Sequence, residues 1–208
     1  ISSADEGMWL LSRPPSAAIK AAYGFEPSAP WLEHMQKSCV RFETGGSGSL
    51  VSSDGLVMTN HHVGSDMLVK LSTPERDLME TGFCARTRDQ ELKCPDLELR
   101  VLWEVADVTE LVNAGAAGAA SAADAGAMRR KAIAEIEAES VRTTGLTSEV
   151  VALYQGGVYQ LYRYKAFTDV RLVFAPEFAI AFFGGDPDNF MFPRYDLDVS
   201  FMRIYGED

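Results

Sequence analysis

Residues Gly46-Ser-Gly-Ser-Leu-Val-Ser-Ser-Asp-Gly-Leu-Val-Met-Thr-Asn-His-His-Val63 decide the fold of this chain. Leu50-Val51 and Leu56-Val57-Met58 are short β-prone runs, and Ser53-Asp54-Gly55 between them carries the Asp-Gly signal of a tight hairpin turn. We therefore predict a β-hairpin whose second strand ends in a histidine.

The histidine pair at the end of the predicted hairpin is the first candidate for chemistry. A glycine-serine strand, a turn and a strand ending in Thr-Asn-x-His-Val resemble the opening of many bacterial trypsin-like serine proteases. That pattern selects His62 as the candidate general base. His61 is adjacent, and strand alternation is expected to point the two rings in different directions.

The rest of the chain alternates between strand-like and helical zones. Short helical patches are expected at 16–23 and near Trp31–Met35, strands over 38–103 and 149–205, and an alanine-rich helical excursion over 107–141. Three glycines between 115 and 126 weaken the front of that helix, so we place its start near Ala127. Within the zones, the expected strands are 40–42, 98–103, 159–167, 170–174, 178–183 and 199–205. A mainly β fold, a β-barrel interrupted by one helical excursion, fits this layout.

Composition narrows the class of protein. The 208 residues are 47% apolar and 24% charged, which is ordinary for a globular protein. A formal net charge of −11 argues against nucleic acid or anionic lipid as the main partner. We find no apolar run near the ~20 residues of a membrane span, and no signal peptide at the start of this sequence. The three cysteines fit no zinc pattern; Cys84 and Cys94 either form a loop disulfide or stay reduced.

A catalytic histidine of this kind needs a buried carboxylate to hold its tautomer. Asp198 precedes the alternating run Val-Ser-Phe-Met-Arg-Ile, as expected of a barrel strand that carries such an aspartate at its start. Asp196, two residues upstream, would face the same side and is the alternative. Both could instead be strand-edge charges that oppose sheet pairing.

Longer motifs make a family resemblance specific. The segment Phe182-Phe-Gly-Gly-Asp-Pro-Asp-Asn-Phe-Met-Phe-Pro-Arg-Tyr-Asp-Leu-Asp198 resembles the signature of the bacterial dipeptidyl-peptidase family of serine exopeptidases related to dipeptidyl peptidases seven and eleven. Asp5–Trp9, Gly46–His62 and Cys94–Val105 are similar to stretches of that family as well. Val63 departs from it, because many members have cysteine after the histidine.

The resemblance implies a trypsin-like (chymotrypsin-fold) double β-barrel, of which residues 1–208 are the N-terminal portion. It implies His62 as general base, Asp198 as its orienting partner, and Asn189 and Phe190 as the site for the substrate's α-amino group. An amide and an aromatic face suit an ammonium. The nucleophilic serine, the second barrel and a helical domain would lie downstream, so this fragment alone should be inactive.

The family also implies where the protein acts and on what. Its members are periplasmic or surface enzymes of Gram-negative bacteria that release dipeptides from oligopeptides with a free N-terminus, and they tend to be homodimers. No cofactor or metal is expected. Asp186-x-Asp188-Asn189 lacks the spacing of a calcium loop, and Gly45-Gly-Ser-Gly-Ser49 has no lysine of a phosphate loop.

Two alternatives stay open on the residues themselves. The hairpin alone would also suit a trypsin-like endopeptidase, and a barrel without its serine would suit a non-catalytic peptide-binding module. Ser47 and Ser49 are expected to be strand residues and not the nucleophile, because a serine there would reverse the His, Asp, Ser order of the fold.

Overall fold

The strands of this protein form a single antiparallel sheet. The computed structural model describes Gly7 and residues 9–206, except for the side chains of residues 188–190. Within these residues the sheet has ten strands. They are β1 (Cys39–Phe42), β2 (Ser47–Leu50), β3 (Leu56–Thr59), β4 (Phe83–Cys84), β5 (Leu92–Lys93), β6 (Leu99–Asp107), β7 (Thr147–Leu153), β8 (Val158–Phe167), β9 (Asp169–Ala175) and β10 (Ser200–Tyr205).

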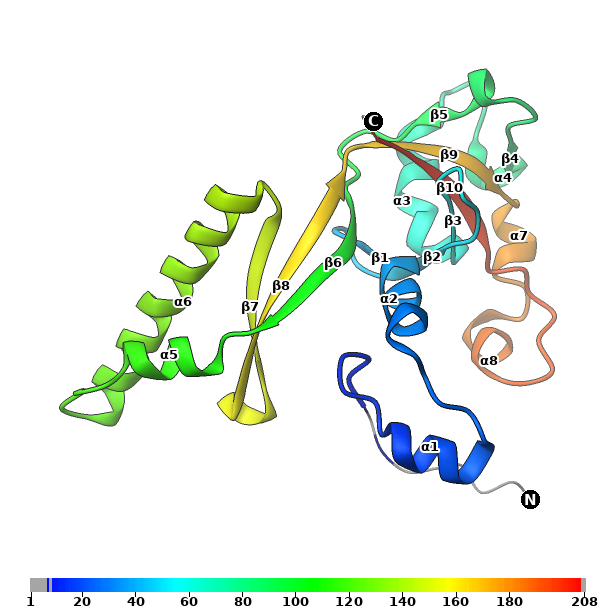
Figure 1. Ribbon diagram of the computed structural model, residues 1–208. Helices are drawn as coiled ribbons and strands as arrows, with labels where there is room; N and C mark the ends of the chain where they lie inside the picture. The colour runs from blue at the N-terminus through cyan, green and yellow to red at the C-terminus, as the bar shows by residue number, and fades with distance from the viewer. Residues whose placement is uncertain (1–6, 8, 207–208) are drawn as a thin grey trace.

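Two helices precede the first strand, and the others are inserted between strands (Figure 1). They are α1 (Ser16–Tyr23), α2 (Ala29–Ser38), α3 (His61–Leu71), α4 (Leu78–Thr81), α5 (Thr109–Gly115), α6 (Ala122–Thr144), α7 (Phe178–Ala181) and α8 (Gly185–Phe190), with the 3-10 turns η1 (Arg88–Gln90) and η2 (Tyr154–Gly156). No helix in the described ranges has the length and apolarity needed to cross a bilayer.

Part of the sheet curls round on itself. Neighbouring strands follow the order β9, β10, β3, β2, β1 and β6. The chain segment that contains β5 and β6 connects the two sides of this order. Leu92 of β5 pairs with Leu172 in β9, and Val101 of β6 pairs with Val40 in β1. The mainly β, barrel-like architecture expected from the sequence is therefore present.

Alternation along the strands fills the inside of this curled sheet. In β10 the buried positions are Ser200, Met202 and Ile204, and in β1 they are Val40 and Phe42. Each fully buried aliphatic or aromatic side chain contributes about 1.5–3 kcal/mol of transfer free energy. The largest fully buried apolar side chains are Phe42, Met67, Leu68, Leu78, Leu99, Leu172 and Met202.

An arm extends from the barrel. Strands β6, β8 and β7 run outward together, and α5 and α6 lie along them (Figure 1). A second small core of Val108, Val112 and Leu161 holds the helices to the strands. The helix α6 begins at Ala122, earlier than the expected Ala127, because Ser121 caps it by accepting a hydrogen bond from the Asp124 N–H at 3.1 Å.

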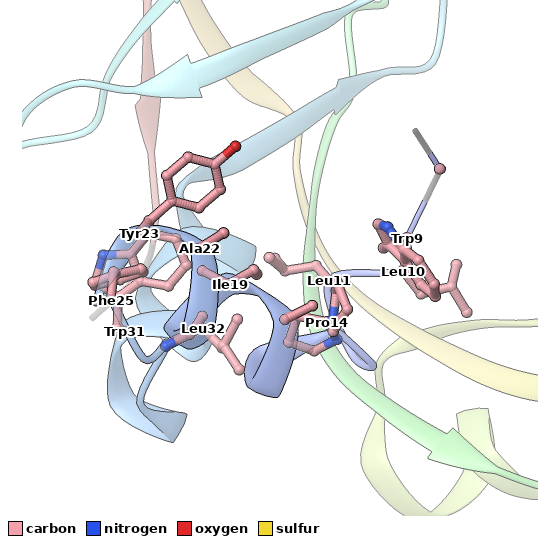
Figure 2. A pocket seen from close by; sticks show the side chains of 14 residues that line it. Trp9, Leu10, Leu11, Pro14, Ile19, Ala22, Tyr23, Phe25, Trp31 and Leu32 are labelled. Carbon is pink, nitrogen blue, oxygen red and sulfur yellow. The ribbon is translucent and has the colours of Figure 1, made fainter. Parts of the chain in front are cut away.

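The N-terminal helices match the two expected helical patches. Between them lies an apolar pocket of about 520 Å³, and Figure 2 shows Trp9, Leu11, Ile19 and Trp31 around it. Tyr23 is its sole titratable lining residue among those the structure describes. The lining is otherwise apolar, so the pocket suits an apolar group.

One expected strand is absent, and the structure shows the state of the cysteines. The apolar run expected as a strand at 178–183 forms the helix α7 and the turn after it, which lie beside α3. A short apolar run does not distinguish a buried strand from a buried helical turn. The cysteines are free thiols in the structure, and burial raises the pKa of Cys94 to about 12.

Candidate active site

The predicted hairpin is present, but His62 does not end its second strand. Strand β3 stops at Thr59, and His62 lies in the first turn of α3. The buried positions of this helix are His61, Gly64, Met67 and Leu68, a spacing of three to four residues. Two of these four buried positions are a histidine and a glycine, which carry no apolar signal, so the sequence did not reveal the helical period and the strand prediction was wrong at this point.

The two histidines face different environments because consecutive residues of a helix are about 100° apart. His61 is 2% exposed, whereas the His62 side chain is 58% exposed. Burial lowers the pKa of His61, opposed by the charge of Asp198 and by a hydrogen bond with the backbone of Pro176. Burial therefore favours the neutral form of His61, and His62 is the histidine whose ring is exposed.

The register of β10 brings Asp198 to the start of α3. Ser200 pairs with Thr59 in the antiparallel ladder. Because the two strands are antiparallel, the residue two positions before Ser200 lies opposite the residue two positions after Thr59. Asp198 therefore lies beside the two histidines. This long-range pairing places a carboxylate next to a histidine 136 residues away in sequence.

Asp198 binds His62 through both of its carboxylate oxygens. Oδ2 lies 2.7 Å from His62 Nδ1, and Oδ1 accepts a hydrogen bond from the His62 backbone N–H at 3.0 Å. The Asp198 side chain is only 6% exposed. A buried carboxylate in this position favours the tautomer with the proton on Nδ1, which leaves the Nε2 lone pair free to accept a proton.

Asp196, the alternative carboxylate, is not the one that pairs with His62. Its Oδ2 is buried and makes no hydrogen bond within the described part of the chain. The ion pair of His62 is made with Asp198.

A pocket of about 260 Å³ opens beside the pair. Its walls are His61, His62, Phe178, Ala181, Phe182, Asp186 and Asp198. The rings of Phe178 and Phe182 stack with centroids 5.4 Å apart. The pocket thus offers an aromatic wall and the carboxylates of Asp186 and Asp198 next to the exposed imidazole. Neither Phe178 nor Phe182 was predicted for this site, because both fall in the apolar run that was expected to be a strand.

The helix α8 begins at this pocket. Gly184 precedes it with φ 78°, a left-handed conformation that favours glycine, and Asp186 lines the pocket from its first turn. Asn189 and Phe190, the residues expected to hold the substrate amine, lie at the end of α8. Their side chains are outside the part of the structure that is described.

The serines flanked by glycines lie on a strand, as expected. Ser47 and Ser49 belong to β2 and pair with Arg41 and Cys39 of β1. Among the residues that the structure describes, no serine hydroxyl hydrogen-bonds to the His62 imidazole. The described part of the site therefore holds an exposed imidazole paired with a buried carboxylate, with no serine hydroxyl bonded to that imidazole. No cluster of metal-ligating side chains occurs in the described ranges.

The chain is similar to known peptidases of one family. The sequence model described as Peptidase S46 matches residues 4–208. The chain is 34% identical over 211 residues to dipeptidyl-peptidase 7 of Porphyromonas endodontalis, covering 98% of this chain and 26% of that protein. It is 33% identical over 222 residues to the Asp/Glu-specific dipeptidyl-peptidase of Porphyromonas gingivalis, covering 100% of this chain and 30% of that protein.

The fold is similar as well. The crystal structure of Porphyromonas endodontalis DPP11 in complex with the dipeptide Arg-Glu superposes with a TM-score of 0.78 at 29% sequence identity. The match covers 99% of this chain and 31% of that structure. The chain thus spans less than a third of the length of the relatives that it matches.

Proposed function

This chain belongs to the peptidase S46 family, and we propose that it is the N-terminal portion of a serine exopeptidase that releases dipeptides from the free N-terminus of oligopeptides. The single observation that carries the proposal is the contact of 2.7 Å between His62 Nδ1 and Asp198 Oδ2. The dipeptidyl-peptidase relatives support the reaction class, and their greater length supports a nucleophilic serine supplied by a second barrel beyond residue 208.

In this proposal His62 is the general base. Its Nε2 takes the proton of the serine hydroxyl as the oxygen attacks the scissile carbonyl, and then gives that proton to the leaving amine. Asp198 stays ionised, holds the Nδ1 proton and stabilises the imidazolium that forms. The buried position of Asp198 strengthens this interaction because the local dielectric is low.

Recognition of the substrate N-terminus is assigned to α8. Asn189 would accept a hydrogen bond from the α-ammonium through its amide oxygen, and Phe190 would offer an aromatic face to the same cation. The position of Asp186 in the pocket beside His62 supports this, because α8 starts at the reacting centre. An amine site near the base would limit cleavage to the second peptide bond.

The partners follow from the same proposal. Oligopeptides are the substrates, since a related enzyme is described in complex with a dipeptide. We further propose that the whole protein acts in the periplasm or at the cell surface and forms a homodimer, as the family resemblance implies.

The test compares a chromogenic dipeptide reporter that has a free N-terminus with its N-acetylated twin, using the full-length gene product. The proposal predicts turnover of the free reporter alone, abolished by His62→Ala. Equal turnover of both reporters would favour a trypsin-like endopeptidase. No turnover across acidic and hydrophobic dipeptides would favour a peptide-binding module.

A further inference from the structure

We propose that Asn60 is a positioning residue of the reaction: its side-chain amide fixes the Asp198 carboxylate and limits how strongly that carboxylate holds the proton of His62. The inference rests on the proposed function and deepens it. In the sequence, Asn60 is only a residue of the predicted hairpin.

The Asn60 amide is committed to Asp198. Its Nδ2 donates hydrogen bonds to the Asp198 backbone carbonyl and to Asp198 Oδ2, each at 3.1 Å. Asn60 is the N-cap residue of α3, where an asparagine side chain normally accepts a hydrogen bond from its own helix. Among the described residues its side chain makes no such bond. The helix is capped by Asp198 Oδ1 instead, through the His62 N–H at 3.0 Å.

This exchange of partners locks the carboxylate. Oδ1 is held by the backbone of α3, and Oδ2 receives both His62 Nδ1 and Asn60 Nδ2. Rotation of the carboxylate about its Cβ–Cγ bond would break contacts on both oxygens. Asn60 is itself held from β10, because the Ser200 hydroxyl donates to the Asn60 carbonyl at 3.0 Å.

The Asn60 donor also shares the charge on Oδ2. A carboxylate oxygen that accepts two hydrogen bonds attracts the imidazole proton less than one that accepts a single bond. Without the Asn60 donor, Asp198 Oδ2 would attract the imidazole proton more strongly, and a second carboxylate in place of the amide would add its own attraction. Other titratable groups around the pair are His61 and Asp186, which line the same pocket, Asp66 one turn further along α3, and Asp196 two residues before Asp198. None of them changes in the variants below.

The test measures kcat/KM against pH for the full-length protein with the free dipeptide reporter. Asn60→Asp keeps the shape of the side chain but places a carboxylate about 3 Å from Asp198. We expect the acid limb of the profile to move upward by about one pH unit or more. For Asn60→Ala, a water molecule replaces the exposed amide, so we expect a smaller upward shift. The matched control is Asn113→Asp, which adds the same charge on α5 in the arm and should leave the limb in place.

An Asn60→Asp profile that differs from wild type in amplitude alone would overturn the inference, because a merely structural role lowers the active fraction without moving the limb. If Asn60→Asp does not fold, the acid limb of Asn60→Ala decides in the same way. The proposed function is tested separately in the same experiment. Residual turnover by His62→Ala would remove that function, whereas an unmoved limb in the Asn60 variants would remove only the role of Asn60.

Discussion

The substitution Asp198→Asn has a consequence that follows from the hydrogen bonds of the site. Asp198 acts as an acceptor on both sides, with Oδ1 toward the His62 backbone N–H and Oδ2 toward His62 Nδ1 and Asn60 Nδ2. An asparagine side chain of the same shape keeps only one oxygen. One side of the new amide must therefore present an N–H where the wild type presents a lone pair.

Both orientations of the new amide impair the base. With oxygen toward the His62 backbone, the new NH2 faces Nδ1 and the Asn60 donor, so the imidazole must turn to the tautomer with its proton on Nε2 and loses its basic lone pair. With oxygen toward Nδ1, the NH2 opposes the backbone N–H and the cap of α3 is lost. Substitutions of this type lower turnover by about 10⁴-fold in a serine protease triad. This corresponds to about 5 kcal/mol in the activation barrier.

The assay is kcat and KM of the full-length protein on the free dipeptide reporter, with the unfolding midpoint measured in parallel. We expect kcat to fall by roughly three to four orders of magnitude, with KM changed little, because the loss is confined to the transition state. Asp196→Asn is the matched control, two residues upstream, and should stay within about threefold of wild type. A fall of less than about tenfold in folded Asp198→Asn would refute the assignment of the orienting acid.

Three further outcomes concern stability. Arg203→Met removes the 2.8 Å ion pair to Glu91, whose side chain is 2% exposed. Denaturant titration should show that the free energy of unfolding falls by about 3–5 kcal/mol. An unchanged midpoint of unfolding would contradict this. Because burial lowers the pKa of His61, the unfolded chain binds a proton there before the folded one does, so stability should decline as pH falls below ~6.5. His61→Gln should flatten that decline, and an equal slope in both proteins would exclude His61 as its source. Gly115→Ala would place its β-carbon 2.5 Å from an α6 alanine and should destabilise the arm by about 1–3 kcal/mol. Gly126→Ala meets only a flexible arginine and should stabilise α6 by about 0.5–1 kcal/mol. Thermal melts in which both substitutions change stability in the same direction would contradict this packing.

Local signals in the sequence predicted the hairpin and the strand after Asp198. Gly55 has φ 81°, which the Asp-Gly turn requires, and a β-carbon there would also lie 2.5 Å from the Ile204 carbonyl oxygen. The run Val-Ser-Phe-Met-Arg-Ile after Asp198 predicted a strand from residue 199 onward, and β10 occupies Ser200–Tyr205. Both signals act over a few residues, so no knowledge of the tertiary structure was needed.

Features that depend on distant partners were missed or misread. The start of α3 was read as strand, although His61 and Gly64 bury one face of a helix against the rest of the core. Phe178 was placed in a strand because a short apolar run does not reveal its period. The contact between Asn60 and Asp198 depends on the register of β10 against β3, which pairs residues about 140 positions apart. No local pattern specifies that register.

The most direct test of the account follows the products of an unlabelled octapeptide by mass spectrometry, with its N-acetylated twin in a parallel reaction. The full-length protein should release dipeptides in order from the free N-terminus and leave the acetylated peptide intact, and the His62→Ala protein should release none. Internal cleavage of the acetylated peptide, or dipeptide release that survives His62→Ala, would contradict the assignment of this chain to a dipeptidyl peptidase that uses His62 as its base.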